Sequence, residues 1–114
     1  MTPIIIESNK ITKLFSIFIP VAAITIFPFI IVSSEYNNKT TINHETIHIE
    51  QQKELYIVFF YILYVYYWLK GKIKGMTNVA AYMSIPFEKE AYLKQYDDKY
   101  LLNRKRHSWK KYAA

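Results

Sequence analysis

The sequence predicts a small α+β domain, in which a short β-ribbon packs on one long helix and a second helix lies beside it. The stretch from 14 to 32 is rich in Ile, Val, Thr and Phe, which favour strands. The stretch from 41 to 69 predicts one helix of about 40 Å that ends near Lys70-Gly71. Pro86 and the acidic residues after it are typical of the first turn of another helix, which would run to about Asn103.

The first apolar stretch has two interpretations. Residues 14–32 are 19 residues without a charge, preceded by two lysines, which is long enough for a membrane-spanning helix. Pro20, Pro28 and the β-branched composition favour strands instead. We therefore expect two buried strands, at about 14–19 and 22–32, broken at Pro20 and with Pro28 at an edge or a bulge.

Residues 44–48, with the sequence His-Glu-Thr-Ile-His, form an HExxH motif. On a helix, residues four apart lie on one face and about 6 Å apart along the axis. His44 and His48 can therefore bind one Zn²⁺ through their ring nitrogens. Glu45 points beside that face, where it can take a proton from a metal-bound water without being a ligand itself.

Polar residues on both sides of the motif can cap the helix or support the site. Thr40, Thr41 and Asn43 are candidate N-caps. Gln51 and Gln52 follow on the faces of the two histidines, so they could hold ligands or substrate.

A zinc hydrolase needs a third protein ligand and an open fourth position. We favour Glu88, which shares a face of the predicted second helix with Ala91 and Tyr92. Ala91 is small, so it lets the two helices pack closely. Glu90 is the rival ligand: it lies about 200° around the helix from Glu88, so both cannot face the metal. If Glu90 is not a ligand, we expect it to pair on the surface with Lys94.

The HExxH motif and the downstream Glu88-Lys89-Glu90-Ala91 together resemble the gluzincin group of zinc metallopeptidases. The wider pattern is similar to small uncharacterised bacterial and phage proteins that are regarded as peptidases. The resemblance spans about residues 20–110, and it implies a minimal zincin-like fold with His44, His48 and Glu88 as zinc ligands and Glu45 as the general base. The chain departs from the pattern at Tyr92, where many gluzincins have an aspartate that supports a ligand histidine. A tyrosine oxygen can accept an imidazole N–H bond, but it brings no negative charge.

Length and composition predict a single domain, 1–114, with a basic tail at about 104–114. The chain has no cysteine, so thiolate metal sites are excluded. The net charge of +6 comes partly from the tail, which we expect to be solvated. No RNA- or DNA-binding signature accompanies it, so we expect no specific nucleic-acid partner. His107 is expected to be a solvated tail residue; the alternative makes it a transition-state stabiliser or a substitute ligand.

The motifs favour a zinc-dependent hydrolase that acts on a peptide or protein substrate. An edge strand within 22–32 could pair with such a peptide. The runner-up is a small membrane-associated protein without enzymatic activity, in which the metal site is fortuitous or purely structural. Residues 55–69 are short for a membrane span and include five tyrosines, which prefer an interface, so peripheral membrane contact is open. We expect the chain in the cytoplasm or at a membrane.

Overall fold

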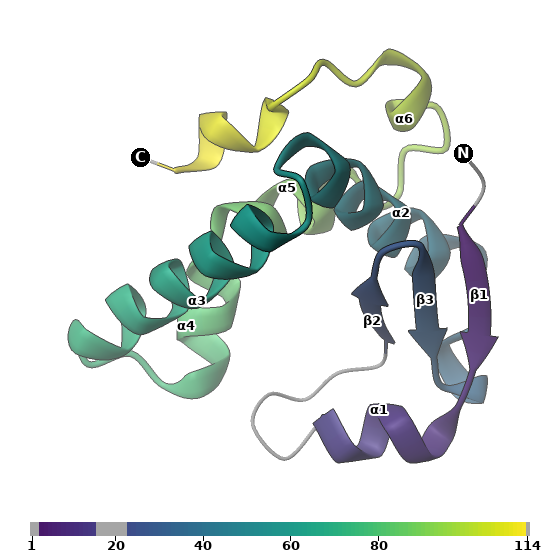
Figure 1. The fold of residues 1–114 in the computed structure, drawn as a ribbon, viewed down its shortest axis with the longest axis horizontal. Coiled ribbons are helices and arrows are strands. Elements are labelled where there is room, and N and C mark those ends of the chain that lie inside the picture. Colours follow the sequence, from purple (N-terminus) through teal and green to yellow (C-terminus); the bar gives the residue numbers. More distant parts are fainter. Residues whose placement is uncertain (1–2, 16–22, 114) are drawn as a thin grey trace.

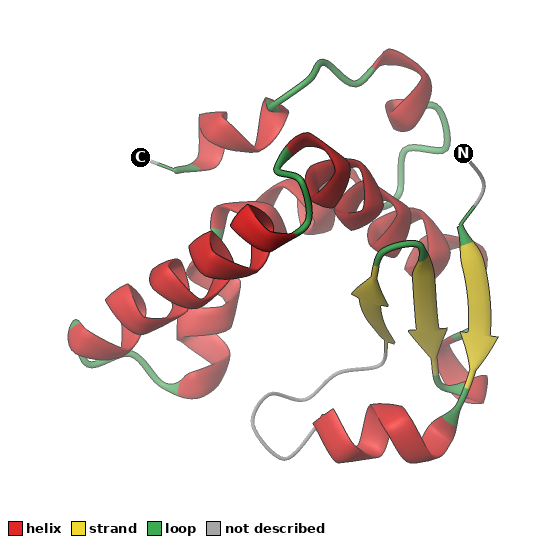
Figure 2. Ribbon diagram, viewed as in Figure 1, coloured by secondary structure: helices red, strands yellow, loops and turns green. Residues whose placement is uncertain are grey.

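The computed structural model describes residues 3–15 and 23–113. These residues form an α+β fold, which confirms the predicted class (Figure 2). A small sheet lies at one end of the molecule, and the helices that follow it build the other end (Figure 1). The elements run in the order β1 (Ile4–Glu7), α1 (Asn9–Phe15), β2 (Ala23–Ile26), β3 (Phe29–Val32), η1 (Ser34–Tyr36), α2 (Lys39–Glu54), α3 (Val58–Ile73), α4 (Asn78–Ser84), α5 (Pro86–Lys94), α6 (Tyr100–Asn103) and η2 (Ser108–Tyr112).

The sheet has the strand order β1-β3-β2. β3 pairs in parallel with β1 and antiparallel with β2, and its Ile30 and Val32 are fully buried. The single strand predicted at 22–32 is instead divided into β2 and β3, which form a hairpin. Pro28 lies in the turn of this hairpin instead of at an edge or a bulge, because proline cannot donate to a ladder. β1 was not predicted.

The predicted strand at 14–19 is wrong where it can be compared, because residues 14 and 15 end helix α1. The rest of that strand lies outside the described residues. Within the described part of the chain, no helix has both the length and the apolar character needed to cross a membrane.

Gln52 fixes the hairpin to α2. Its side-chain nitrogen donates to the Thr25 carbonyl at 2.9 Å, and its side-chain oxygen accepts from the Phe27 N–H at 2.8 Å. Gln52 was predicted to hold a ligand or substrate. Its amide is instead used to hold β2 against the helix that carries the HExxH motif.

The predicted continuous helix 41–69 is interrupted. α2 ends at Glu54 and α3 begins at Val58. Between them, Tyr56 and Ile57 have φ values of 54° and 66°, in the left-handed region that β-branched residues rarely adopt. The Ile57 N–H donates to the Gln52 carbonyl at 2.7 Å and closes this turn. The break lets α3 leave the line of α2, as Figure 1 shows.

The main apolar core lies between α3, α5 and the C-terminal segment. Phe60, Ile85, Phe87 and Trp109 form its buried cluster. α4 was not predicted, and it packs along α3. The two helices approach closely at Gly71, which has no Cβ. A Cβ at this position would lie only 3.0 Å from the Cβ of Ala81.

The C-terminal region is packed, and the predicted solvated tail is wrong for much of its length. α5 ends at Lys94 instead of Asn103. Ser108 and Trp109 are buried against α5, and His107 is half-buried. The side chain of Arg104 is almost fully buried and bridges two carboxylates: its Nη1 lies 2.5 Å from Glu54 Oε2, and its Nε lies 2.6 Å from Glu90 Oε2.

This buried bridge generates a stability prediction. Arg104→Met should lower the free energy of unfolding by about 3–5 kcal/mol, because it leaves two buried carboxylates without their cation. The matched control is Lys39→Met, which removes a cation from the exposed Lys39–Asp98 pair and should cost less than about 1 kcal/mol. Urea unfolding followed by circular dichroism measures both variants. Equal losses in the two variants would show that the buried bridge has no special weight.

Candidate metal centre

Helix α2 places the HExxH motif in the interior. Its N-cap is Asn38, whose side chain accepts a hydrogen bond from the Thr41 N–H at 2.9 Å, and not one of the predicted caps. Asn43, one of those predicted caps, instead donates to the Gln95 carbonyl at 2.8 Å, beyond the end of α5. His44, Glu45 and His48 are all buried, with 4–6% of each residue exposed.

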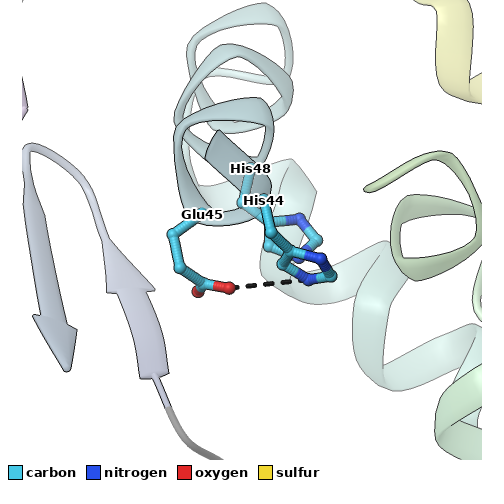
Figure 3. A group of neighbouring side chains, drawn as sticks. All are labelled: His44, Glu45 and His48. Atoms are coloured by element: carbon cyan, nitrogen blue, oxygen red, sulfur yellow. Dashed lines mark ion pairs between the residues drawn. The ribbon is translucent and has the colours of Figure 1, made fainter. Parts of the chain in front are cut away.

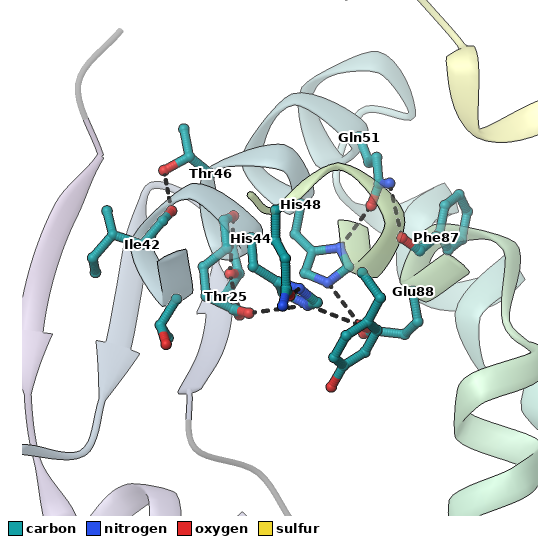
Figure 4. A network of polar contacts seen from close by, with 12 residues as sticks. Thr25, Ile42, His44, Thr46, His48, Gln51, Phe87 and Glu88 are labelled. Carbon is teal, nitrogen blue, oxygen red and sulfur yellow. Dashed lines mark hydrogen bonds and ion pairs between the residues drawn. The ribbon is translucent and has the colours of Figure 1, made fainter. Parts of the chain in front are cut away.

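Helix α5 brings Glu88 against both histidines. Glu88 Oε1 lies 3.1 Å from His44 Nε2 and 3.1 Å from His48 Nε2, and Glu88 is 3% exposed (Figure 4). Pro86 occupies the first turn of α5, with Ile85 at the N-cap. Ala91 is fully buried, as expected for a close contact between the two helices.

The tautomer of His48 follows from the hydrogen bonds of Gln51. Gln51 Nε2 donates to the Phe87 carbonyl at 3.1 Å and to Glu90 Oε1 at 2.9 Å. Both partners can only accept, so the amide nitrogen of Gln51 must face them and its oxygen must face His48. Gln51 Oε1 lies 2.7 Å from His48 Nδ1. His48 therefore carries a proton on Nδ1, and in its neutral form the ring would turn a bare Nε2 toward Glu88.

Gln95 plays the same part for His44. Its Oε1 lies 2.8 Å from His44 Nδ1 and accepts the proton of that nitrogen. With both rings neutral, two bare imidazole nitrogens and a carboxylate oxygen then point at one another. Three acceptor atoms repel one another unless a cation lies among them.

The pKa values of His48 and Glu88 are shifted because the two groups lie so close together. Burial alone lowers the pKa of His48, but the adjacent Glu88 carboxylate outweighs it and raises that pKa to about 9. Burial alone raises the pKa of Glu88, but His48 and His44 outweigh it and hold the pKa far below its usual range. These interactions favour the positively charged form of His48, whose Nε2 then donates to Glu88 Oε1 unless a metal ion takes the place of that proton.

The donor set fits zinc. Tetrahedral Zn²⁺ with ligands at about 2.0–2.1 Å requires ligand atoms about 3.3–3.4 Å from one another. The two 3.1 Å separations at Glu88 Oε1 are close to that requirement. Imidazole nitrogen and carboxylate oxygen are also ligands that zinc prefers.

Glu45 is the other acidic residue beside the histidines. His44, Glu45 and His48 also offer three donor atoms within 4.8 Å of one another, so Glu45 is an alternative third ligand. Its Oε2 lies 3.5 Å from His44 Nε2 (Figure 3), whereas Glu88 Oε1 contacts both rings. Glu45 Oε1 accepts a hydrogen bond from Thr25 Oγ1 of β2 at 2.8 Å. The geometry therefore favours Glu88 as the ligand and leaves Glu45 beside the centre.

Tyr64 of α3 supports Glu88 from the other side. Its hydroxyl donates to Glu88 Oε2 at 2.8 Å, which leaves Oε1 for the histidines. Burial, and then the charge of Glu88, raise the pKa of Tyr64 well above its usual value. The phenol therefore stays protonated and remains a neutral hydrogen-bond donor. Tyr64 reaches Glu88 because the chain turns between α2 and α3.

Tyr92 lies near His44, but not in its expected role. Its ring centroid is 4.4 Å from that of His44 in an edge-on arrangement, and its hydroxyl lies 3.1 Å from the hydroxyl of Tyr82. The hydrogen bond expected from Tyr92 to the imidazole is formed by Gln95 instead.

Glu90 points away from the histidines, and neither expectation for it holds. It is fully buried and accepts hydrogen bonds from Gln51, Tyr100 and Arg104 instead of pairing with Lys94 on the surface. Burial alone raises its pKa, but the hydrogen bonds from Arg104, Tyr100 and Gln51 and the charge of Arg104 together outweigh this, so the pKa is lowered. Through Gln51, this fixed charge holds the tautomer of His48.

Three supporting residues were missed in the sequence. Gln95 lies seven residues after Glu88, on the same helical side, so that spacing could have revealed it. Thr25 is a polar residue in an apolar strand, which is a weaker signal. Tyr64 carries no signal, because it is one of four tyrosines in its helix.

A hollow of about 510 Å³ lies beside the motif. His44 and Glu45 lie in its wall, so the centre has access to it. The other lining residues are uncharged, and four are tyrosines: Ala23, Tyr36, Asn38, Thr40, Thr41, Tyr82, Tyr92, Gln95 and Tyr96.

The two glutamates of α5 give a direct prediction. Glu88→Ala should abolish stoichiometric zinc binding, because it removes one of three ligands. Glu90→Gln should retain one zinc per chain, because Glu90 does not contact the histidines. Calorimetric titration of the metal-free protein with Zn²⁺ measures both. Loss of zinc from the Glu90 variant, with zinc kept by the Glu88 variant, would reverse the assignment.

Comparison of the chain with protein-family models, with curated proteins and with solved structures gave no match. Its function must therefore be argued from the geometry of the site.

Proposed function

We propose that the chain is a zinc-dependent hydrolase that cleaves peptide bonds. The convergence of His44 Nε2, His48 Nε2 and Glu88 Oε1, with Glu45 beside them, supports this most strongly. These three atoms would hold the zinc. Glu45 has an oxygen close to His44 and is not needed as a ligand, as a general base requires.

In such a reaction, some side chains of the protein would transfer protons and others would position the reacting groups. A bound zinc would lower the pKa of water toward about 7 and polarise the scissile carbonyl. Glu45 Oε2 would accept the proton of the attacking water and deliver it to the leaving amine. The Thr25 hydroxyl occupies Oε1 and so keeps Oε2 on the side of the histidines. Gln51 and Gln95 hold the two rings in the ligand tautomer.

Tyr82 and Tyr92 are suited to stabilise the oxygen of the substrate. Both line the hollow beside Glu45. Burial raises the pKa of each phenol, so each stays protonated at neutral pH and can donate a hydrogen bond. A neutral donor beside the reacting carbonyl stabilises the negative charge that develops there.

The walls of the hollow favour an extended, uncharged segment of peptide. β2 pairs only with β3 in the described sheet, so its other side is an edge to which a peptide strand can add. At Thr25 the carbonyl on β2 already accepts from Gln52 and Tyr61. A peptide would therefore pair at the Ala23 end of the strand, which also lines the hollow.

A purely structural zinc is the second candidate. Its support is the burial of the ligands, since the side chains of His44, His48 and Glu88 are only 5–7% exposed. In that case zinc would stabilise the fold without turnover. A membrane-associated protein without a metal would be a third class. Metal content separates the third class from the other two, and turnover separates the first two.

Glu45→Gln tests the role of the base. The variant should keep one zinc per chain and lose hydrolysis by about 10²–10⁴-fold, because an amide cannot accept the proton of water. Metal analysis and cleavage of a library of quenched fluorescent peptides measure both properties. A variant that loses its zinc, or that keeps full activity, would contradict the assignment.

Thr25 tests the positioning of that base. Thr25→Val removes the hydroxyl with little change of shape and should lower kcat by about tenfold or more, because it removes a hydrogen bond to a charged group. Zinc binding should be unchanged. Thr25→Ser restores a hydroxyl and should recover most of the rate, whereas equal losses in both variants would point to packing instead.

A further inference from the structure

The outward side of α3 is apolar along the whole helix. Val58, Ile62, Val65, Leu69 and Ile73 recur every three or four residues, so they lie on one side, which we call the α3 outer face. Each is 47–87% exposed. The opposite side of the helix carries its buried residues, Phe60 and Gly71. A helix that is apolar on both sides is expected to be covered on both sides.

The charge around this face has a single sign. No Asp or Glu occurs between Leu55 and Phe87, so neither α3 nor α4 carries an acidic residue. Lys70, Lys72 and Lys74 gather at the C-terminal end of α3, and Lys70 and Lys74 are exposed. The turn that follows them lies at the end of the molecule opposite the sheet (Figure 1). The outer face and its lysines are therefore free of the sheet.

Aromatic residues of the type found at membrane–water interfaces lie beside the α3 outer face. Phe59 and Tyr66 flank the stripe and are 57% and 54% exposed. Lys72 Nζ lies 5.9 Å from the centre of the Trp68 ring. Tyr and Trp are enriched where membranes meet water, and lysine can reach headgroups while its stem lies on apolar surface. The stripe is about 22 Å long, shorter than the 30 Å of a bilayer core, so it suits a helix that lies along the surface.

We propose that the α3 outer face docks on a lipid bilayer that contains anionic headgroups. The apolar stripe enters the boundary between headgroups and acyl chains, and the three lysines contact lipid phosphates. Charge complementarity selects this occupant over a second copy of the chain. Two α3 outer faces placed together would offer no acidic residue from α3 or α4 of either copy to pair with the lysines of the other.

Vesicle sedimentation tests this docking directly, and it does not depend on zinc or hydrolysis. The full chain is mixed with vesicles of phosphatidylcholine alone or of phosphatidylcholine with one quarter phosphatidylglycerol. Binding should be at least tenfold stronger to the anionic vesicles and should weaken as salt is raised, because salt screens the lysines. Alkaline carbonate should release the bound protein, as expected for surface attachment.

Two matched pairs of variants locate the contact. Ile62→Asp with Leu69→Asp should weaken binding at least tenfold, whereas Leu93→Asp with Leu102→Asp, which adds the same charge at exposed leucines outside α3 and α4, should weaken it far less. Vesicle binding should likewise be weakened more by Lys70→Glu with Lys74→Glu than by Lys110→Glu with Lys111→Glu. The second pair is a matched control, because all four lysines are exposed. Circular dichroism checks that every variant is folded.

Four results would overturn the proposal. One is the absence of binding to anionic vesicles. Another is an equal loss in the α3 variants and their controls, which would indicate a nonspecific charge effect. A third is a wild-type dimer in sedimentation velocity that shows no vesicle binding and that Ile62→Asp with Leu69→Asp converts to monomer, which would make a second copy the occupant. Retention on vesicles that only detergent reverses would also contradict surface docking.

Discussion

The convergence of two imidazole nitrogens and one carboxylate oxygen in the interior is the constraint on which the structure depends. Glu88 Oε1 lies 3.1 Å from each imidazole nitrogen, and buried acceptor atoms this close are unfavourable without a cation, so each group is fixed by a hydrogen bond on its far side. Gln51, Gln95 and Tyr64 each contact one member of this centre, and they come from α2, from the C-cap of α5 and from α3. The arrangement explains why α2, α3 and α5 must meet at one point in so small a chain.

The residues that hold the site are themselves held by further hydrogen bonds and ion pairs. Glu90 orients Gln51, and Arg104 neutralises Glu90 together with Glu54. A C-terminal basic residue thus stabilises the tautomer of a histidine some fifty residues away in the chain. On the other side, Thr25 and Gln52 join the β2–β3 hairpin to α2, so the sheet positions Glu45. The sheet and the C-terminal segment are therefore parts of the same centre.

The site residues that lie on a common helical face could be predicted from the sequence. His44 and His48 share a helical face, and Glu88 with Ala91 marks the close approach of a second helix, so these residues were identified from their spacing together with the resemblance to gluzincins. The break at Tyr56 and Ile57 could not be predicted, because neither residue favours a positive φ and no glycine or proline stands there. Its reason is tertiary: only a chain that turns here can bring Tyr64 to Glu88. The burial of Arg104 was missed for a similar reason, since a basic run predicts solvent unless its carboxylate partners are known.

The central claim is that the two histidines and Glu88 hold zinc. X-ray absorption spectroscopy of the zinc-loaded full chain tests it most directly. The account predicts four-coordinate zinc, with nitrogen and oxygen neighbours at about 2.0–2.1 Å and the outer-shell scattering of two imidazoles. Zinc surrounded only by oxygen in a six-coordinate shell, without imidazole scattering, would contradict it.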